Sequence, residues 1–269
     1  MRLWPGRRRV TVPVVRLQGT IGLGGGLRPG LSLSGVATGL KKAFAMRGPA
    51  VAIVVNSPGG SPAQSSLIYA RIRALAEEHD KTVITFVEDV AASGGYWIAV
   101  AGDEIVADAT SIVGSIGVVS AGFGFTELLE KIGVERRIYT TGENKVILDP
   151  FTPEKEHDIA ILKGIQTDIQ KAFVSVVTSR RGEKLADDPD LFTGRFWTGT
   201  AAQRLGLVDG LGEVRNVLVE RYGKNVQLRP VPVSRPSIWR GRLGVAQGLS
   251  AESVIGAVRA DRLWERFGL

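Results

Sequence analysis

The segment AASGGY, residues 91–96, combines a nucleophilic side chain with the backbone freedom that covalent catalysis needs. It follows an apolar run at residues 82–88 and leads into a second apolar run, which predicts a turn between a strand and a short helix. The N-terminus of that helix and the Gly94 N–H would favour negative charge beside Ser93. Ser93 is therefore a candidate nucleophile, and the alternative is that its hydroxyl only caps the helix.

A second turn of this kind, NSPGG at residues 56–60, could bind the charge that such a nucleophile creates. Gly59 and Gly60 allow the backbone to approach a ligand without a side chain in the way, and exposed N–H groups can hold an oxyanion. The alternative is an ordinary turn between the apolar strand at residues 50–56 and the helix that follows it.

A serine hydroxyl also needs a base, and the sequence offers few. Its two histidines, His79 and His157, lie among charged residues in AEEHDK and EKEHD. A lysine can take the proton if its amine is neutral, which requires a fall in pKa from about 10.4 to about 7 at a cost of about 4 kcal/mol. Lys145 precedes the apolar run Val-Ile-Leu, which could form a desolvating pocket; the alternative is a surface lysine.

Strand and helix patterns alternate along the chain and predict the elements that hold these segments. Alternating and β-branched residues predict a first strand at 10–17, and fully apolar runs predict buried strands at 50–56 and 82–88. Further strand-like runs are expected within 104–120 and at 134–140. Helices are expected at 35–46, 65–78, 126–133 and 153–181. The alternation indicates an α/β domain built from βαβ units.

We expect one domain over residues 1–234 and a C-terminal appendix over 235–269, irregular at first and weakly amphipathic over 249–267. No run reaches the roughly 18–20 apolar residues of a membrane span, and no apolar run of signal-peptide length follows the charged N-terminus. We therefore expect a chain without a transmembrane segment, either cytoplasmic or in peripheral contact with a membrane.

The net charge of +7 is carried by the ends of the chain. Residues 1–50 hold nine basic and no acidic residues, whereas residues 51–209 hold 15 basic and 22 acidic ones. Basic ends could contact anionic lipid, and solvated Arg-rich ends are the simpler interpretation. Without an aromatic platform or a nucleic-acid-binding module, we expect no nucleic-acid partner. The lack of cysteine excludes disulfides, a thiol nucleophile and thiolate metal sites.

Four short segments in this order resemble the signal peptide peptidase A (SppA) family of Ser/Lys proteases: NSPGG at 56–60, AASGGYWIA at 91–99, GSIGV at 114–118 and the lysine after TGEN. The resemblance covers roughly residues 10–225. It implies the α/β fold shared by ClpP and the crotonases, with repeated ββα units around a mostly parallel sheet and, in this chain, a C-terminal helical appendix.

The resemblance also implies roles for individual catalytic residues. Ser93 would attack the scissile carbonyl and Lys145 would take its proton. The amides of Gly59 and Gly94 would form the oxyanion hole, and Ser115 would hydrogen-bond the lysine amine and orient it.

The same resemblance implies how a substrate would bind. Its backbone would lie along Gly60 as an added β-strand, and apolar residues beside the nucleophile, among them Val90 and Ile116, would form shallow pockets. The expected substrates are extended apolar peptides such as remnant signal peptides. No metal and no cofactor are expected.

The chain departs from the family pattern at Asn144, where an aromatic residue often precedes the lysine, and in lacking the common N-terminal anchor and the tandem duplication of the long form. It resembles the short bacterial form, whose subunits assemble into rings in which the serine and lysine of neighbours meet. We therefore expect a homo-oligomeric ring.

Two other classes of function remain open at this point. A crotonase-like acyl-CoA enzyme could use Glu88 and Asp89 as acid and base, although a Ser-Gly-Gly turn has no role in hydration. A catalytically silent scaffold could bind peptides or a membrane partner, although Ser93 and Lys145 are both present.

Overall fold

The computed structural model describes residues 9–22, 30–233, 258 and 261–268. The chain divides into two compact units: unit 1 comprises Met1–Ile116 and Val174–Leu269, and unit 2 comprises Gly117–Phe173. The expected boundary at residue 234 adjoins the end of a described stretch and stays a prediction.

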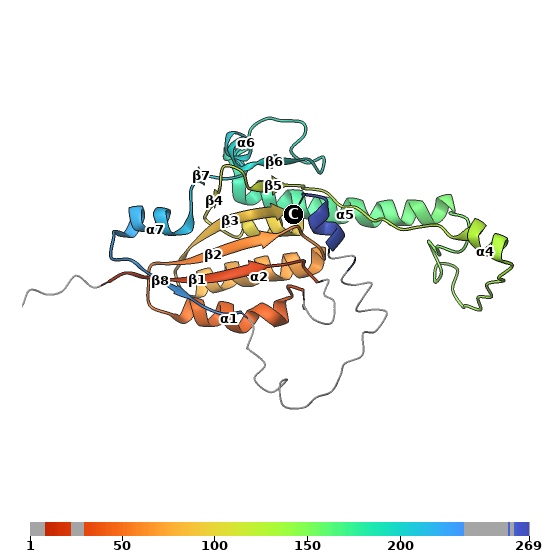
Figure 1. The fold of residues 1–269 in the computed structure, drawn as a ribbon, viewed down its shortest axis with the longest axis horizontal. Helices are drawn as coiled ribbons and strands as arrows, with labels where there is room; N and C mark the ends of the chain where they lie inside the picture. The colour runs from red at the N-terminus through yellow and green to blue at the C-terminus, as the bar shows by residue number, and fades with distance from the viewer. Residues whose placement is uncertain (1–8, 23–29, 234–257, 259–260, 269) are drawn as a thin grey trace, which may run out of the picture. The chain divides into compact units, whose positions relative to one another are not determined.

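Unit 1 is built on a mostly parallel sheet, which confirms the α/β prediction (Figure 1). Its path runs β6-β5-β3-β2-β1-β8, and β4 joins β3 to β7. Every pair among these strands is parallel except β5 with β6. The strands are β1 (Thr11–Gln18), β2 (Ala50–Ser57), β3 (Thr82–Ala92), β4 (Glu104–Ala107), β5 (Ile112–Gly114), β6 (Phe196–Thr198), β7 (Gly210–Leu211) and β8 (Gln227–Pro230).

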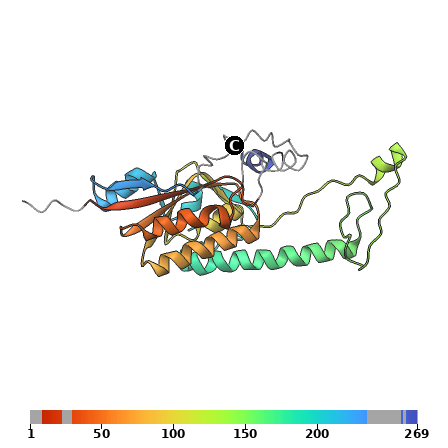
Figure 2. The ribbon, with the colours of Figure 1, turned by 90° about the horizontal axis from the view of Figure 1, so that it is seen from below.

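Helices cover both faces of this sheet, with α1 and α2 on one face and α7 on the other (Figure 2). Ser32 and Ser61 begin α1 and α2, because their side chains accept hydrogen bonds from backbone N–H groups of the first turn. The helices are α1 (Leu33–Ala45), α2 (Pro62–Glu78), α3 (Gly94–Ala99), α4 (Thr126–Ile132), α5 (Glu156–Arg181), α6 (Gly199–Arg204) and α7 (Val214–Tyr222), with a 3₁₀ turn at Gly182–Lys184.

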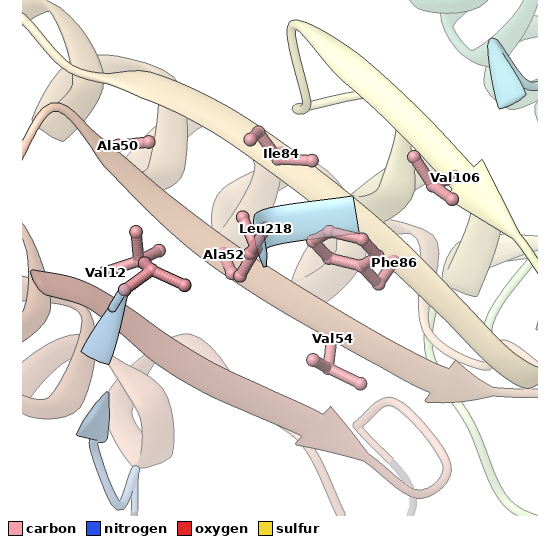
Figure 3. Packing of buried hydrophobic residues seen from close by; sticks show 9 residues of the cluster. Val12, Ala50, Ala52, Val54, Ile84, Phe86, Val106 and Leu218 are labelled. Atoms are coloured by element: carbon pink, nitrogen blue, oxygen red, sulfur yellow. The ribbon is translucent and has the colours of Figure 1, made fainter. Parts of the chain in front are cut away.

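The core forms because the central strands are apolar on both faces. Every residue of β2 is buried, and a cluster of β-strand side chains packs against Leu218 of α7 (Figure 3). Among its members Ala52, Ile84 and Phe86 come from the two strands that lead to the NSPGG and AASGG turns. Because β2 and β3 are parallel neighbours, their carboxyl ends and both turns lie at the same edge of the sheet.

Strand β3 is longer than its sequence predicts. It continues past Glu88 to Ala92, and its register against β2 shifts between the pairs Val55–Val87 and Ser57–Ala91. Glu88 and Asp89, which resemble a strand end in the sequence, lie within this irregular part of β3. Pairing with β2 continues at Ala91, two residues before Ser93.

The strand predicted at 134–140 is wrong. These residues are exposed and form no strand in the structure. A β-branched run becomes a strand only where a partner strand accepts its hydrogen bonds, and unit 2, described throughout, contains no strand.

Unit 2 does not bury an apolar core of its own. Over its residues 117–173 only Asp149, Asp158 and Phe173 are buried. Large apolar side chains are instead exposed, namely Val119, Phe123, Phe125, Leu128, Ile132, Val134, Ile138, Tyr139 and Ile165. Such a surface is typical of a region that packs against another chain.

Part of the expected C-terminal helix lies within the described residues, since 261–265 are helical. Residues 249–257 and 259–260 of that prediction, and the irregular segment from Arg235, lie outside the described residues. Within the described part of the chain, no helix has the length and apolar character needed to cross a membrane.

Candidate active site

Ser93 occupies the N-cap position of α3 in an unusual backbone conformation, with φ 52° and ψ −124°. A positive φ is uncommon for a residue with a Cβ atom, and such strain persists where the surroundings fix it. Its hydroxyl makes no capping hydrogen bond, in contrast to Ser32, which accepts from the Gly35 N–H. The helix cap therefore does not explain this serine, and its hydroxyl is left for other chemistry.

The conformation of Ser93 is held from both sides. Its N–H donates to the Gly114 carbonyl at 2.8 Å, and its own carbonyl accepts from the Trp97 N–H at 3.0 Å. All six residues of α3 are buried. Tyr96 anchors this helix by donating its hydroxyl to the Leu207 carbonyl at 2.8 Å, and burial raises the pKa of Tyr96. The serine is thus fixed on a rigid turn.

Gly59 lies directly against this turn. A Cβ atom on Gly59 would lie 2.8 Å from the Ser93 Cβ, 2.9 Å from the Ala92 carbonyl oxygen and 3.0 Å from the Gly94 nitrogen. Only glycine permits this approach, and φ is +104°. The structure therefore brings Ser93, Gly59 and Gly94 together, and their roles as nucleophile and oxyanion hole stay predictions.

The two expected oxyanion donors differ in their present partners. The Gly59 N–H donates to the Ser57 hydroxyl at 3.2 Å, a long bond within its own turn. The Gly94 N–H belongs to the first turn of α3, where a helix supplies no acceptor. An oxyanion could thus accept directly from the Gly94 N–H. It would accept from the Gly59 N–H by replacing the Ser57 hydroxyl as the acceptor of that group.

Gly60 presents an open backbone edge beside the site. On one side its neighbours are paired with Ile21: the Ile21 N–H donates to the Gly59 carbonyl, and the Ser61 N–H donates to the Ile21 carbonyl, both at 2.8 Å. In an extended chain the polar groups of successive residues point to opposite edges. The N–H and carbonyl of Gly60 therefore face away from Ile21, and no described residue pairs with them.

Ser115 lies next to the residue that accepts from the Ser93 N–H, Gly114. It follows Gly114, has φ 54°, is 3% exposed, and donates its N–H to the Arg195 carbonyl at 2.7 Å. Gly114 is required here, since a Cβ atom would lie 2.8 Å from the Trp197 ring. The Ser115 side chain has no hydrogen-bond partner among the described residues, so its hydroxyl can bind a further group.

The two apolar residues expected to line substrate pockets, Val90 and Ile116, both belong to unit 1 and are fully buried. Val90 forms a buried cluster with Ala92 and Phe267, and Trp264 packs against this cluster. Trp264 and Phe267 were not among the site residues predicted from the sequence. Their spacing of three residues on an amphipathic helix was the available signal.

Lys145 lies in unit 2, in a loop tied to the first turn of α5. Its side chain is exposed, and its N–H donates to the Gly142 carbonyl at 3.2 Å. Asn144 contacts the ring of His157 at 3.2 Å, and the Leu148 N–H donates to the Asp158 carboxylate at 3.2 Å. Unit 2 thus holds the loop but does not itself supply the apolar pocket expected for the lysine.

His157 and the buried Asp158, which hold the loop that carries Lys145, were not predicted from the sequence. In the sequence they are part of a charged run, EKEHD, with no sign of these contacts.

Glu88 and Asp89 are already engaged by partners. Arg16 forms an ion pair with Glu88, and the Asn56 side-chain amide donates to Asp89 at 2.6 Å. These contacts hold the irregular part of β3, so neither carboxylate is a free acid or base of the crotonase kind.

An ion-pair network fixes the C-terminal end of α5 within unit 1. Arg181, which is 3% exposed, donates to both oxygens of Asp209, and Lys184 donates to the same carboxylate. Burial opposes ionisation of Asp209, but hydrogen bonds from Arg181 and Lys184 outweigh it and hold the pKa of Asp209 below its usual range.

A family model decides how this arrangement is classified. The model described as peptidase family S49 matches residues 76–229, which include Ser93, Ser115 and Lys145. The chain belongs to peptidase family S49. The turn at Gly59 and Gly60 precedes the matched residues, and only Gly59 of the two lies against Ser93. The expected roles of both glycines stay predictions.

Similar proteins agree with S49 membership. A putative protease of Synechocystis sp. is 33% identical over 213 residues, covering 78% of this chain and 73% of that protein. The putative signal peptide peptidase SppA of Enterococcus faecium is 33% identical over 168 residues, covering 62% of this chain and 48% of its own length. The resemblance to the SppA family is confirmed.

A third relative carries a different name. A Brucella abortus protein named as the Na(+)/H(+) antiporter NhaA is 56% identical over 286 residues, which cover 100% of this chain and 39% of that protein. The chain thus spans about two fifths of the length of this relative, whose name describes the whole protein.

A solved structure has a similar fold. A mutant of the 1510-N membrane-bound stomatin-specific protease aligns with a TM-score of 0.53 and 17% identity, over 85% of this chain and 99% of that one. This similarity supports the ClpP-like fold.

Proposed function

We propose that this S49 chain is a serine endopeptidase in which Ser93 is the nucleophile and Lys145 the general base. The observation that carries the proposal is the backbone of Ser93, strained at φ 52° and packed against Gly59, with a hydroxyl that makes no capping bond. Strain of this kind is concentrated at functional sites, and here it has no structural purpose as a helix cap.

In the proposed reaction the Ser93 oxygen bonds to the scissile carbonyl carbon while its proton passes to the Lys145 amine. The carbonyl electron pair moves to the oxygen, which receives hydrogen bonds from the N–H groups of Gly59 and Gly94. The tetrahedral intermediate collapses by breaking the C–N bond, and the leaving amine takes the proton from the lysine.

Hydrolysis of the resulting ester completes the cycle. A water molecule gives a proton to Lys145 as its oxygen attacks the acyl carbon, and the bond to Ser93 breaks as that proton returns to the serine oxygen. Ser115 is proposed to orient the lysine amine through its unpartnered hydroxyl.

The proposed substrates are extended apolar peptides, including remnant signal peptides. The open N–H and carbonyl of Gly60 support this class, because an extended peptide can pair with them as an added strand while a folded chain cannot. The name of the Enterococcus faecium relative, a putative signal peptide peptidase, agrees with it.

We further propose a ring in which Lys145 of one subunit serves Ser93 of a neighbour. Unit 2 leaves both Lys145 and many large apolar side chains exposed. A second copy packed on this surface would bury those side chains and desolvate the lysine, which favours the neutral amine that a base requires.

The deciding experiment compares two serines that occupy the same kind of position. Ser93→Ala should abolish cleavage of an apolar peptide and labelling by a fluorophosphonate, while the free energy of unfolding stays unchanged because no cap bond is lost. The matched control, Ser32→Ala, should keep activity and lose about 1 kcal/mol of stability because it removes a real cap. Mass spectrometry of the labelled peptide identifies the nucleophile.

Retention of turnover or of labelling by Ser93→Ala would reject the proposed nucleophile. A folded wild-type protein that takes up no probe and cleaves no peptide, alone or assembled, would favour the catalytically silent scaffold instead.

A further inference from the structure

The C-terminal residues Trp264 and Phe267 cover the apolar surface that leads to Ser93. Phe267 is 8% exposed and forms a buried cluster with Val90 and Ala92, both of which are fully buried. Trp264 packs against the same cluster. All of these residues belong to unit 1.

This contact approaches the nucleophile along two paths. On one side, Ala92 is the residue directly before Ser93. On the other, Phe267 meets Phe196 edge-on with ring centroids 5.1 Å apart, and Phe196 pairs with Gly114, the residue whose carbonyl accepts from the Ser93 N–H. Phe267 is therefore connected to Ser93 through Ala92 on one path and through Phe196 and Gly114 on the other.

Within the described residues 261–268, only Phe267 is buried. Residues 258 and 261–265 are helical, and the side chains of Asp261, Arg262, Glu265 and Arg266 are exposed. Because most of the stability of a helix in a protein comes from packing of its apolar face, the position of this segment depends on the packing of Trp264 and Phe267. An apolar group that binds the same surface can displace it.

We propose that residues 261–268 form a displaceable cap, which occupies an apolar subsite beside Ser93 until a substrate side chain takes its place. The inference rests on the proposed function. Val90 was expected to contact substrate yet is fully buried, and a cap that leaves when substrate binds accounts for both. The cap thereby selects for substrates apolar enough to compete with Trp264 and Phe267.

The first test uses the full chain carrying Trp264→Ala and Phe267→Ala together, with the exposed neighbour Glu265→Ala as the matched control. Each protein reacts with a small alkyl fluorophosphonate and with a peptidyl phosphonate that bears a large apolar side chain. The double variant should react about tenfold faster with the apolar probe, equivalent to about 1.4 kcal/mol. Its rate with the small probe, and both rates of the control, should match those of the wild type.

An apolar-probe rate that is unchanged or lower in the double variant, with normal small-probe labelling, overturns the cap. Absence of small-probe labelling in the wild type counts instead against the proposed function.

A second measurement needs neither turnover nor the aromatic variants. The full-length Ser93→Ala protein is mixed with an extended leucine-rich decapeptide, and hydrogen–deuterium exchange is followed over residues 261–268. Displacement predicts faster exchange of these amides when the peptide binds. Slower or unchanged exchange at saturating peptide overturns the proposal.

Discussion

Replacement of Gly59 by alanine tests the arrangement of the proposed nucleophile, Ser93, and the proposed oxyanion hole. The added Cβ atom would lie 2.8 Å from the Ser93 Cβ, and these atoms must separate by about 0.6 Å to reach 3.4 Å, where ordinary van der Waals contact begins. The new methyl group also sits 3.0 Å from the Gly94 nitrogen, the second expected oxyanion donor. Since loss of one such donor costs about 10²–10³-fold in kcat, we expect a loss of that order.

The control must separate this clash from backbone strain, because alanine at φ +104° is strained wherever it occurs. Gly223, which ends α7, has φ +88° and no atom within 4 Å of an added Cβ. Both alanine variants should therefore lose about 1–3 kcal/mol of stability from strain alone. Only the Gly59→Ala variant should lose activity.

The assay is kcat and KM for an extended apolar peptide, with the free energy of unfolding measured by urea titration. Gly59→Ala should lower kcat more than it raises KM, since the affected contacts form with the oxyanion. If Gly59→Ala keeps kcat within a few-fold of Gly223→Ala, then Gly59 is only a turn residue and the proposed oxyanion hole is wrong.

Three further predictions concern the base, the assembly and acid stability. The double variant His79→Ala/His157→Gln should keep most activity, because glutamine can still bond Asn144; a large loss would contradict the lysine base. Mixing Ser93→Ala with Lys145→Ala subunits should restore cleavage, whereas proven exchange without recovery would place the site in one protomer. Asp209→Asn should cost about 3 kcal/mol at pH 7 by leaving Arg181 unpaired. Because the pKa of Asp209 is lowered in the folded state, the wild type should lose this stability as pH falls below about 4. In urea titrations at several pH values, the free energy of unfolding of the variant should therefore depend less on pH than that of the wild type.

Much of the sheet could be predicted because its strands are fully apolar. The run at 50–56 becomes β2, every residue of which is buried, and the nearby turn follows where Pro58 and two glycines interrupt it. The end of β3 could not be predicted in the same way. Glu88 and Asp89 resemble a strand end, yet ion pairing with Arg16 and hydrogen bonding from Asn56 keep them within the strand.

The candidate site, too, could be predicted from the sequence only in part. Ser93, Gly59 and Gly94 could be predicted together, because strand-to-helix turns after neighbouring parallel strands must meet at one sheet edge. The surroundings of Lys145 could not, since its loop is held by side chains of α5 whose partners no periodic pattern encodes. The covering of Val90 depends on Phe267, which is 177 positions later in the sequence.

These differences indicate that the two units have different roles in the proposed site. Unit 1 buries an apolar core that holds the strained backbone of Ser93, so the proposed nucleophile needs nothing from another chain to keep its conformation. Unit 2 buries little and leaves Lys145 in contact with water, beside many exposed apolar side chains. Burial of that surface would stabilise a subunit contact and favour a neutral amine at the same time. Under this hypothesis Lys145 can act as a base only in the assembled form. An isolated subunit then holds Ser93 in its active conformation but has no neutral amine to take its proton.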